Sequence, residues 1–160
     1  CIRDSIISIL VENKFGVLAR ISGMFSGRGF NIETLNVAPM SDISFSRITT
    51  TIIGDSNALE QAIKQVSKLI NVISVTEYSS GETVERELCL FKIELDSEQR
   101  PRFLETIKGY NFKIINDSEE NLVIEILVKP KRIDALLELI EPYEVIDMAR
   151  TGGVALKLGK

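Results

Sequence analysis

Histidine and tryptophan are absent from this 160-residue chain, and only two cysteines, Cys1 and Cys89, are present. Without histidine, the chain can form no Ser-His or Cys-His catalytic pair and no zinc site of the commonest type. Two isolated cysteines make neither a disulfide framework nor a set of metal ligands. Because Cys89 lies in an apolar run, we expect a small buried residue rather than a reactive thiol. We therefore expect no catalytic residues and no metal site on this chain.

Long apolar runs are also missing, since no stretch reaches the roughly 18 residues that a membrane-spanning helix needs. The residues at the start of the chain lack the apolar core of a signal peptide. A net charge of −4 and an aromatic content of 6% argue against binding to RNA or to an anionic membrane. The basic cluster at residues 129–132 is expected to be a solvated helix start or a partner contact. We expect a cytoplasmic protein, or a plastid protein if the source is eukaryotic, with no nucleic-acid or membrane partner.

The first half of the chain alternates strand-like and helix-like patterns in the order β-α-β-β-α-β. Segments rich in β-branched and apolar residues predict strands over residues 5–11, 31–38, 45–53 and 72–78. Apolar residues at helical spacing predict a helix over residues 15–26, which Gly27 and Gly29 end. A second helix is predicted after the cap residue Asp55 or Ser56, with an apolar face that extends to Ile70.

The second half repeats this order. Strands are predicted over residues 85–95, 112–115, 122–128 and 143–149, with a short extra edge strand over residues 154–158. A weaker helix is predicted over residues 98–108, and another begins at Pro130 and ends before Pro142. The small polar break Ser79-Ser80-Gly81 divides the chain into predicted domains 1–80 and 81–160.

A β-α-β-β-α-β segment folds most simply as a ferredoxin-like sandwich, in which both helices cover one face of a four-stranded antiparallel sheet. The sequence thus predicts an α+β protein with two ferredoxin-like domains. Two domains of this size have thin cores, and one face of each sheet is left uncovered by its helices. We therefore expect association through sheet edges or faces, as a homodimer or a higher homo-oligomer.

The segment Leu10–Leu18 ends a strand, turns and begins a helix, with Gly16 in the predicted first helical turn. Glycine in a helix costs about 1 kcal/mol relative to alanine, and one reason to accept that cost is room for a ligand beside the backbone. The free N–H groups at a helix N-terminus suit a carboxylate. Asn13 can cap this helix or offer its amide to a ligand. An ordinary strand-to-helix turn explains the same residues.

Two further patterns carry no predicted site. The segment Gly27–Glu33 has glycines that suggest a dinucleotide loop, but Ile32 stands where the third glycine belongs, and the segment follows a helix rather than a strand. It is more simply a glycine-terminated helix that leads into a strand. The candidate acid/base carboxylates are expected to be solvated charges on strand faces and turns: Glu85, Glu87, Glu94, Asp96, Glu119 and Glu120.

Two segments, Leu10–Arg20 and Phe25–Pro39, resemble the small regulatory subunit of acetolactate (acetohydroxyacid) synthase, a family with an ACT domain. The strand–turn–glycine–helix opening is typical of ACT domains in general, whereas the run Gly-Phe-Asn-Ile-Glu is specific to this family. Residues 46–49, 84–88 and 149–152 resemble the family too, so that the similarity covers essentially the whole chain.

The resemblance implies an N-terminal ACT domain that pairs edge to edge with the same domain of another subunit and binds L-valine at the interface. By match to the family pattern, Asn13 and Gly16 hold the amino acid, with Val17 and Leu18 nearby. Asn31 and Ile32 of the neighbouring subunit then close the site. The C-terminal domain is ACT-like, and no effector site is transferred to it.

The resemblance further implies a non-catalytic subunit that activates a large catalytic subunit and confers feedback inhibition by valine in branched-chain amino acid biosynthesis. Thiamine diphosphate, Mg²⁺ and FAD are expected on that partner, and no cofactor is expected on this chain. Selection among valine, leucine and isoleucine depends on about one methylene, worth roughly 1–3 kcal/mol. The alternative is an amino-acid-sensing ACT module of another biosynthetic enzyme or regulator.

Overall fold

The computed structural model describes residues 2–78 and 81–159, which form two compact units. The first unit extends to Val84 and also includes the chain from Val154 onward, and the second unit comprises Glu85–Gly153. Each unit has its own hydrophobic core. Within the described residues, no helix is long and apolar enough to cross a membrane. The order β-α-β-β-α-β occurs twice, as the sequence predicts.

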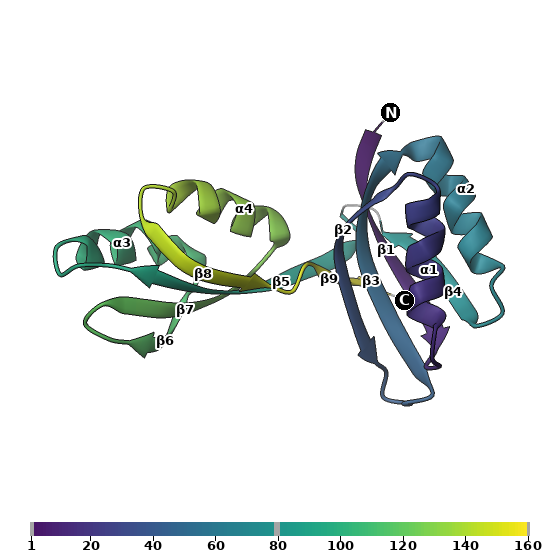
Figure 1. Ribbon diagram of the computed structural model, residues 1–160, viewed down its shortest axis with the longest axis horizontal. Helices are drawn as coiled ribbons and strands as arrows, with labels where there is room; N and C mark the ends of the chain where they lie inside the picture. The colour runs from purple at the N-terminus through teal and green to yellow at the C-terminus, as the bar shows by residue number, and fades with distance from the viewer. Residues whose placement is uncertain (1, 79–80, 160) are drawn as a thin grey trace. The chain divides into compact units, whose positions relative to one another are not determined.

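The first unit contains a four-stranded antiparallel sheet and two helices. Its strands lie in the spatial order β2 (Asn31–Pro39), β3 (Phe45–Asp55), β1 (Ile2–Glu12) and β4 (Val72–Tyr78). The helices α1 (Val17–Gly27) and α2 (Ser56–Ser67) cover the same face of this sheet (Figure 1). This order and this layering confirm the predicted ferredoxin-like fold. They also make β2 an edge strand.

The core of the first unit follows the sequence periodicity. Ile7, Ile9 and Val11 alternate along β1 and are buried against the helices.

The expected cap of α2 is present, because Asp55 Oδ2 accepts a hydrogen bond from Ala58 N at 3.1 Å, and this bond lowers the pKa of Asp55. The expected extension of the apolar face to Ile70 is wrong. Since α2 ends at Ser67, Ile70 lies beyond the helix and is 89% exposed.

Gly54 in β3 allows Phe30 to close the first core. A Cβ at Gly54 would overlap the ring of Phe30, which is buried and meets Phe25 edge-on. We predict that Gly54→Ala lowers the free energy of unfolding by about 1–3 kcal/mol, as overpacking does. The matched control is Gly23→Ala in α1, where a Cβ meets no atom within 4 Å and should stabilise the helix by up to ~1 kcal/mol. Urea unfolding of both variants would measure the difference, and equal stabilities would contradict the prediction.

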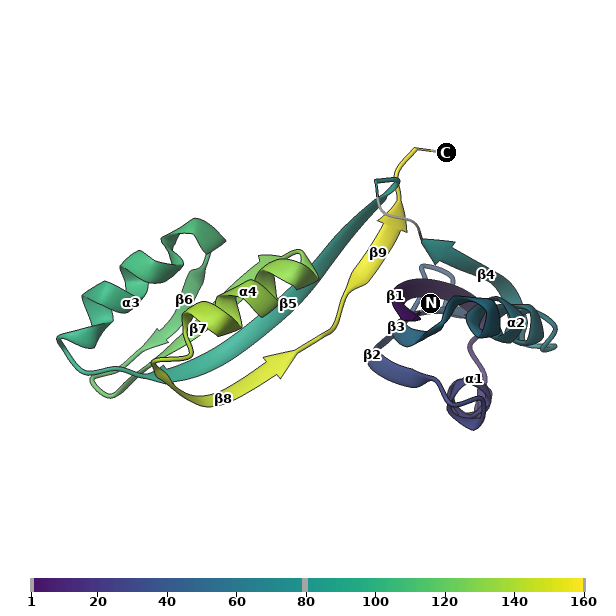
Figure 2. The same cartoon turned by 90° about the horizontal axis from the view of Figure 1, so that it is seen from above.

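The second unit repeats this architecture. Its strands lie in the order β6 (Lys113–Asp117), β7 (Asn121–Val128), β5 (Thr83–Glu94) and β8 (Glu144–Arg150). The extra strand β9 (Val154–Lys157) follows them in the chain and belongs to the first unit. The helices α3 (Gln99–Ile107) and α4 (Pro130–Leu139) lie on one face of this sheet, and a short 3-10 turn, η1 (Lys108–Tyr110), follows α3 (Figure 2). The predicted second set of elements, including the extra strand, is confirmed.

The core of the second unit contains Cys89 and a group of aromatic rings. Phe103 meets Phe91 and Tyr143 edge-on, with ring centroids 6.3 Å and 5.2 Å apart. Cys89 is fully buried, and this burial raises the pKa of its thiol to about 11. The thiol therefore stays protonated at neutral pH, which confirms a packing role rather than a reactive one.

One arginine of the basic cluster at residues 129–132 is engaged within its own unit. Arg132 donates a hydrogen bond to the Gly109 carbonyl at 2.9 Å, and its guanidinium lies 4.5 Å from the centre of the Tyr110 ring. Both contacts fix α4 against η1. This guanidinium thus serves the fold of the second unit.

Candidate functional site

The turn between β1 and α1 places a glycine immediately before the helix. Gly16 has φ 81° and ψ −10°, a left-handed conformation that favours glycine. It is the N-cap residue and not part of the first helical turn, because α1 begins at Val17. The prediction that glycine costs helix stability here is therefore wrong, since the left-handed backbone conformation favours glycine. A Cβ at this position would meet no atom within 4 Å, so that the space beside Gly16 is open in the single chain.

Asn13 holds the loop between β2 and β3 rather than capping α1. Its Nδ2 donates to the Ile43 carbonyl at 2.9 Å, and its backbone N–H donates to the Ser44 carbonyl at 2.7 Å. Of the two roles expected from the sequence, helix capping is wrong, because no side chain caps α1. Asn13 thereby joins the end of the β2–β3 hairpin to the N-terminus of α1.

No side chain caps the N-terminus of α1. Asp55 caps α2, and Asp96 Oδ1 accepts hydrogen bonds from the first backbone N–H groups of α3 at 2.7 and 2.9 Å. The helix α4 begins with Pro130, which has no N–H group. Like α4, α1 has no side-chain cap, but its first residue, Val17, has a backbone N–H group. Its first N–H groups and the positive end of its dipole are thus available to an anion.

The two apolar residues predicted beside the site lie in the first turn of α1. Val17 is buried in the core, whereas Leu18 is 38% exposed. Leu18 can therefore contact a ligand directly, while Val17 anchors the helix. Sequence analysis missed two further apolar side chains near this turn, Phe15 and Ile43, which are 107% and 75% exposed. Their position in loops gives no periodic pattern that could have indicated them.

The remaining two predicted residues lie at the opposite end of α1. Asn31 and Ile32 begin β2 directly after the helix has ended, and α1 has 11 residues, a rise of roughly 16 Å. Asn31 is exposed, and Ile32 is partly buried against the first core. Within one chain, the structure brings Asn13, Gly16 and Leu18 together but not Asn31 and Ile32.

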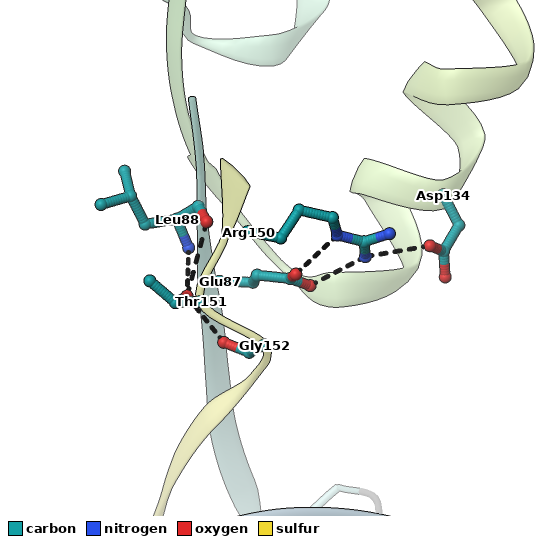
Figure 3. Close-up of polar contacts among 6 residues, drawn as sticks. All are labelled: Glu87, Leu88, Asp134, Arg150, Thr151 and Gly152. Carbon is teal, nitrogen blue, oxygen red and sulfur yellow. Dashed lines mark hydrogen bonds and ion pairs between the residues drawn. The ribbon is translucent and has the colours of Figure 1, made fainter. Parts of the chain in front are cut away.

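A second polar cluster, in the second unit, escaped sequence analysis. Glu87 is 2% exposed, and both of its carboxylate oxygens bind Arg150, at 2.7 and 3.1 Å. Arg150 also binds Asp134 of α4 at 3.0 Å (Figure 3). The prediction that Glu87 is a solvated charge is therefore wrong, because an arginine 63 residues away supplies its partner. This ion pair raises the pKa of Arg150 further above its ordinary value.

The same cluster fixes the end of β8 against β5. The Thr151 hydroxyl accepts a hydrogen bond from Leu88 N at 3.1 Å (Figure 3). The backbone N–H of Thr151 donates to the Leu88 carbonyl, also at 3.1 Å. The family-like segments at residues 84–88 and 149–152 thus meet in space. Within residues 2–78 and 81–159, no three Asp, Glu or Cys side chains are grouped to hold a metal ion.

The sheet order, the two helices on one face and the open, glycine-preceded helix N-terminus define the first unit as an ACT domain. Residues 7–74 match the family model described as the ACT domain of the AHAS small subunit, and residues 86–159 match that of the small subunit of acetolactate synthase. The acetolactate synthase small subunit of Mycolicibacterium smegmatis is 40% identical over 153 residues, which cover 96% of this chain and 90% of the relative. That of Mycobacterium bovis is 39% identical, with coverages of 96% and 91%.

The crystal structure of the acetolactate synthase small subunit from Thermotoga maritima superposes with a TM-score of 0.88. It is 33% identical in sequence, and the match covers 99% of both chains. The chain belongs to the family of acetolactate synthase small subunits.

Proposed function

We propose that this chain is the non-catalytic regulatory subunit of an acetolactate synthase, and that it activates a large catalytic subunit and makes it sensitive to valine. Membership of the small-subunit family supports a larger partner. The observation that carries the effector role is the uncapped N-terminus of α1, preceded by a glycine in a left-handed conformation. The partner is expected to carry thiamine diphosphate, Mg²⁺ and FAD.

The effector site is proposed to form between two copies of the first unit. Because β2 is an edge strand, its outer N–H and C=O groups can pair with a second β2. A strand that pairs with its own two-fold copy must run antiparallel to it. The start of one β2 then faces the end of the other, next to the loop that Asn13 holds. This pairing would bring Asn31 and Ile32 of one copy to the N-terminus of α1 in the other.

The exposed side chains of β2 support this pairing. Leu35 and Val37 are 40% and 43% exposed, and both lie on the face of the sheet that α1 covers. Half-exposed apolar residues on an edge strand beside a helix are well placed for a second strand and helix to cover. We infer that burial of Leu35 and Val37 supplies much of the dimer's stability.

The proposed site matches the three parts of valine. The N–H groups at the start of α1 bind the carboxylate. The side-chain oxygens of Asn13 and of Asn31 from the neighbouring copy accept hydrogen bonds from the ammonium group. Leu18 and Ile32 contact the isopropyl group, for which discrimination against one extra methylene amounts to roughly 1–3 kcal/mol. These roles favour a branched-chain amino acid.

Inhibition is proposed to arise because the occupied and empty dimers fit the catalytic subunit differently. Coupling of this kind typically amounts to about 1–3 kcal/mol, a change of roughly five- to 150-fold. The test is reconstitution with the purified catalytic subunit from the same organism. Addition of this chain should raise acetolactate formation, and valine should then lower it. A catalytic subunit that shows no response to this chain, with or without valine, would contradict the proposal.

A further inference from the structure

The sheet of the first unit has one face that α1 and α2 do not cover (Figure 1). The core residues of β1 and β3 point toward the helices, and the residues between them point to the other side. Rows of directly opposite residues cross this side of the sheet from β2 to β4. We call it the uncovered face and define it by three rows: Ala38, Arg47, Leu10 and Ser74; Asn36, Thr49, Ser8 and Thr76; Thr34, Thr51, Ile6 and Tyr78.

Arg47 lies on a central strand of the uncovered face without a partner in its own chain. Its Nε is buried and forms no hydrogen bond, and no carboxylate within residues 2–78 and 81–159 pairs with its guanidinium. Glu12, which lies further along β1, binds Lys14 at 2.7 Å instead. A buried polar group without a hydrogen bond lowers the stability of the fold, and native proteins contain few of them. The fold of the single chain therefore does not account for Arg47.

The residues around Arg47 are also suited to polar contacts. The row next to it consists of an amide, Asn36, and three hydroxyl groups, those of Thr49, Ser8 and Thr76. Hydroxyl and amide side chains can both donate and accept hydrogen bonds. In the third row, Thr34 Oγ1 is a second buried polar atom without a hydrogen bond. The uncovered face thus combines one unpaired cation with several groups that can bind the backbone of another chain.

We propose that the uncovered face docks onto the catalytic subunit, and that Arg47 binds a carboxylate of that subunit. This inference rests on the proposed function, which supplies the partner. The guanidinium can bind a carboxylate through two parallel hydrogen bonds. This pairing becomes stronger when docking excludes water from it. Docking also gives Arg47 the partner that its own chain does not provide.

The charges of the uncovered face favour a different chain over a second copy. Its three rows contain one cation, Arg47, and no carboxylate. Two copies in face-to-face contact would bring two arginines and no acid together, and like charges at an interface disfavour the complex. Pairing through the edge of β2 leaves this face free, because strands pair through their edges. The occupant must therefore bring its own acidic group.

Activation titrations of the catalytic subunit with variants of the full chain test this inference. Arg47→Met removes the charge and keeps a long side chain. The matched control, Lys64→Met, removes a positive charge from the exposed surface of α2, in the helical layer on the other side of the sheet. Arg47→Met should raise the concentration of the chain that gives half-maximal activation at least tenfold, because the partner's carboxylate loses its counter-charge. Lys64→Met should leave that concentration unchanged, and Arg47→Lys, which keeps the charge without the two parallel bonds, should fall between them.

Two further measurements separate docking from a role of Arg47 in the fold. The half-maximal concentration should rise with salt more steeply for the unaltered chain than for Arg47→Met, because salt screens the ion pair. The urea midpoint of Arg47→Met should be no lower than that of the unaltered chain, since the variant removes a buried N–H group that has no partner. Its affinity for valine should be retained.

The outcomes distinguish this inference from the proposed function. If the unaltered chain activates the catalytic subunit and Arg47→Met does so at the same concentration, the docking inference is overturned and the proposed function stands. If the unaltered chain does not activate, the proposed function itself fails. A lowered urea midpoint for Arg47→Met would overturn the inference, because Arg47 would then serve the fold. A lower average mass of Arg47→Met in sedimentation would overturn it as well, because the uncovered face would then contact a second copy.

Discussion

Gly16→Asp is expected to lower the affinity for valine at least tenfold relative to Gly16→Asn, and still further relative to the unaltered chain. Aspartate and asparagine are nearly equal in size, and both tolerate the left-handed conformation of Gly16 better than most residues do. The difference between them therefore isolates the charge. Two like charges about 4 Å apart repel by roughly 1 kcal/mol in water and 4 kcal/mol at a protein surface, which makes tenfold a conservative figure.

The comparison requires that both variants fold. A Cβ at Gly16 meets no atom within 4 Å, so that the fold of the single chain can accept either side chain. Gly16→Ala completes the series, because it adds the backbone strain of a left-handed residue without a polar group. Isothermal titration with valine would measure all three affinities. If Gly16→Asp and Gly16→Asn bound valine equally well, the ligand's carboxylate would not lie at the start of α1.

Arg150→Met is expected to destabilise the second unit by about 3 kcal/mol. Glu87 is buried, and the loss of Arg150 leaves its carboxylate without a counter-charge. Asp134→Asn removes the third member of the network, but the Asp134 side chain is 64% exposed. That variant should cost less than about 1 kcal/mol, since exposed ion pairs contribute little.

A double variant separates the net contribution of the ion pair to the free energy of unfolding from the cost of leaving Glu87 unpaired. Replacing Glu87 and Arg150 together by methionine removes both charges, and a buried ion pair often loses little when apolar residues of similar volume replace it. We expect the double variant to regain at least half of the stability that Arg150→Met loses. Urea unfolding of the full chain would test this, and a loss for Arg150→Met no larger than that for Asp134→Asn would contradict the burial of Glu87.

Much of the fold follows from the sequence because its cores are periodic. Ile7, Ile9 and Val11 alternate along β1, and Leu59, Ala62 and Val66 recur at helical spacing along α2. Local rules also suffice for the ends of several elements, such as the Asp55 cap and Pro130 at the start of α4. Periodicity and capping residues depend only on neighbours along the chain, so that they can be identified from the sequence alone.

The predictions from the sequence are wrong where a residue far away in the chain, or a backbone dihedral angle, determines the role of a side chain. The sequence predicts Glu87 to be a surface charge, because its partner Arg150 lies 63 positions further along the chain. Asn13 is a candidate helix cap in the sequence, but its side-chain amide donates a hydrogen bond to the carbonyl of Ile43, 30 positions away. The role of Gly16 depends on its φ of 81°, since the helix that was expected to contain it begins one residue later. No pattern of neighbouring residues indicates these contacts or this backbone angle.

The candidate site could be predicted in its parts but not as a whole. Asn13 and Gly16 follow from one short segment, whereas Val17, Leu18, Asn31 and Ile32 come from the family pattern. The eleven residues of α1 separate Asn31 and Ile32 from Asn13 and Gly16 within one chain. The proposed second copy would bring them together, and the single chain does not contain that copy.

Complementation between two defective chains tests the two-copy site most directly. Gly16→Asp disrupts the part of the proposed valine site at the start of α1, and Asn31→Ala disrupts the part on β2. Neither variant alone should bind valine well. In a two-fold dimer of one chain of each kind, one site receives both defects and the other receives none. Random mixing, by co-expression or refolding together, should therefore restore valine binding in about one quarter of the sites. A mixture that binds no more valine than the separate variants would show that each site lies within a single chain.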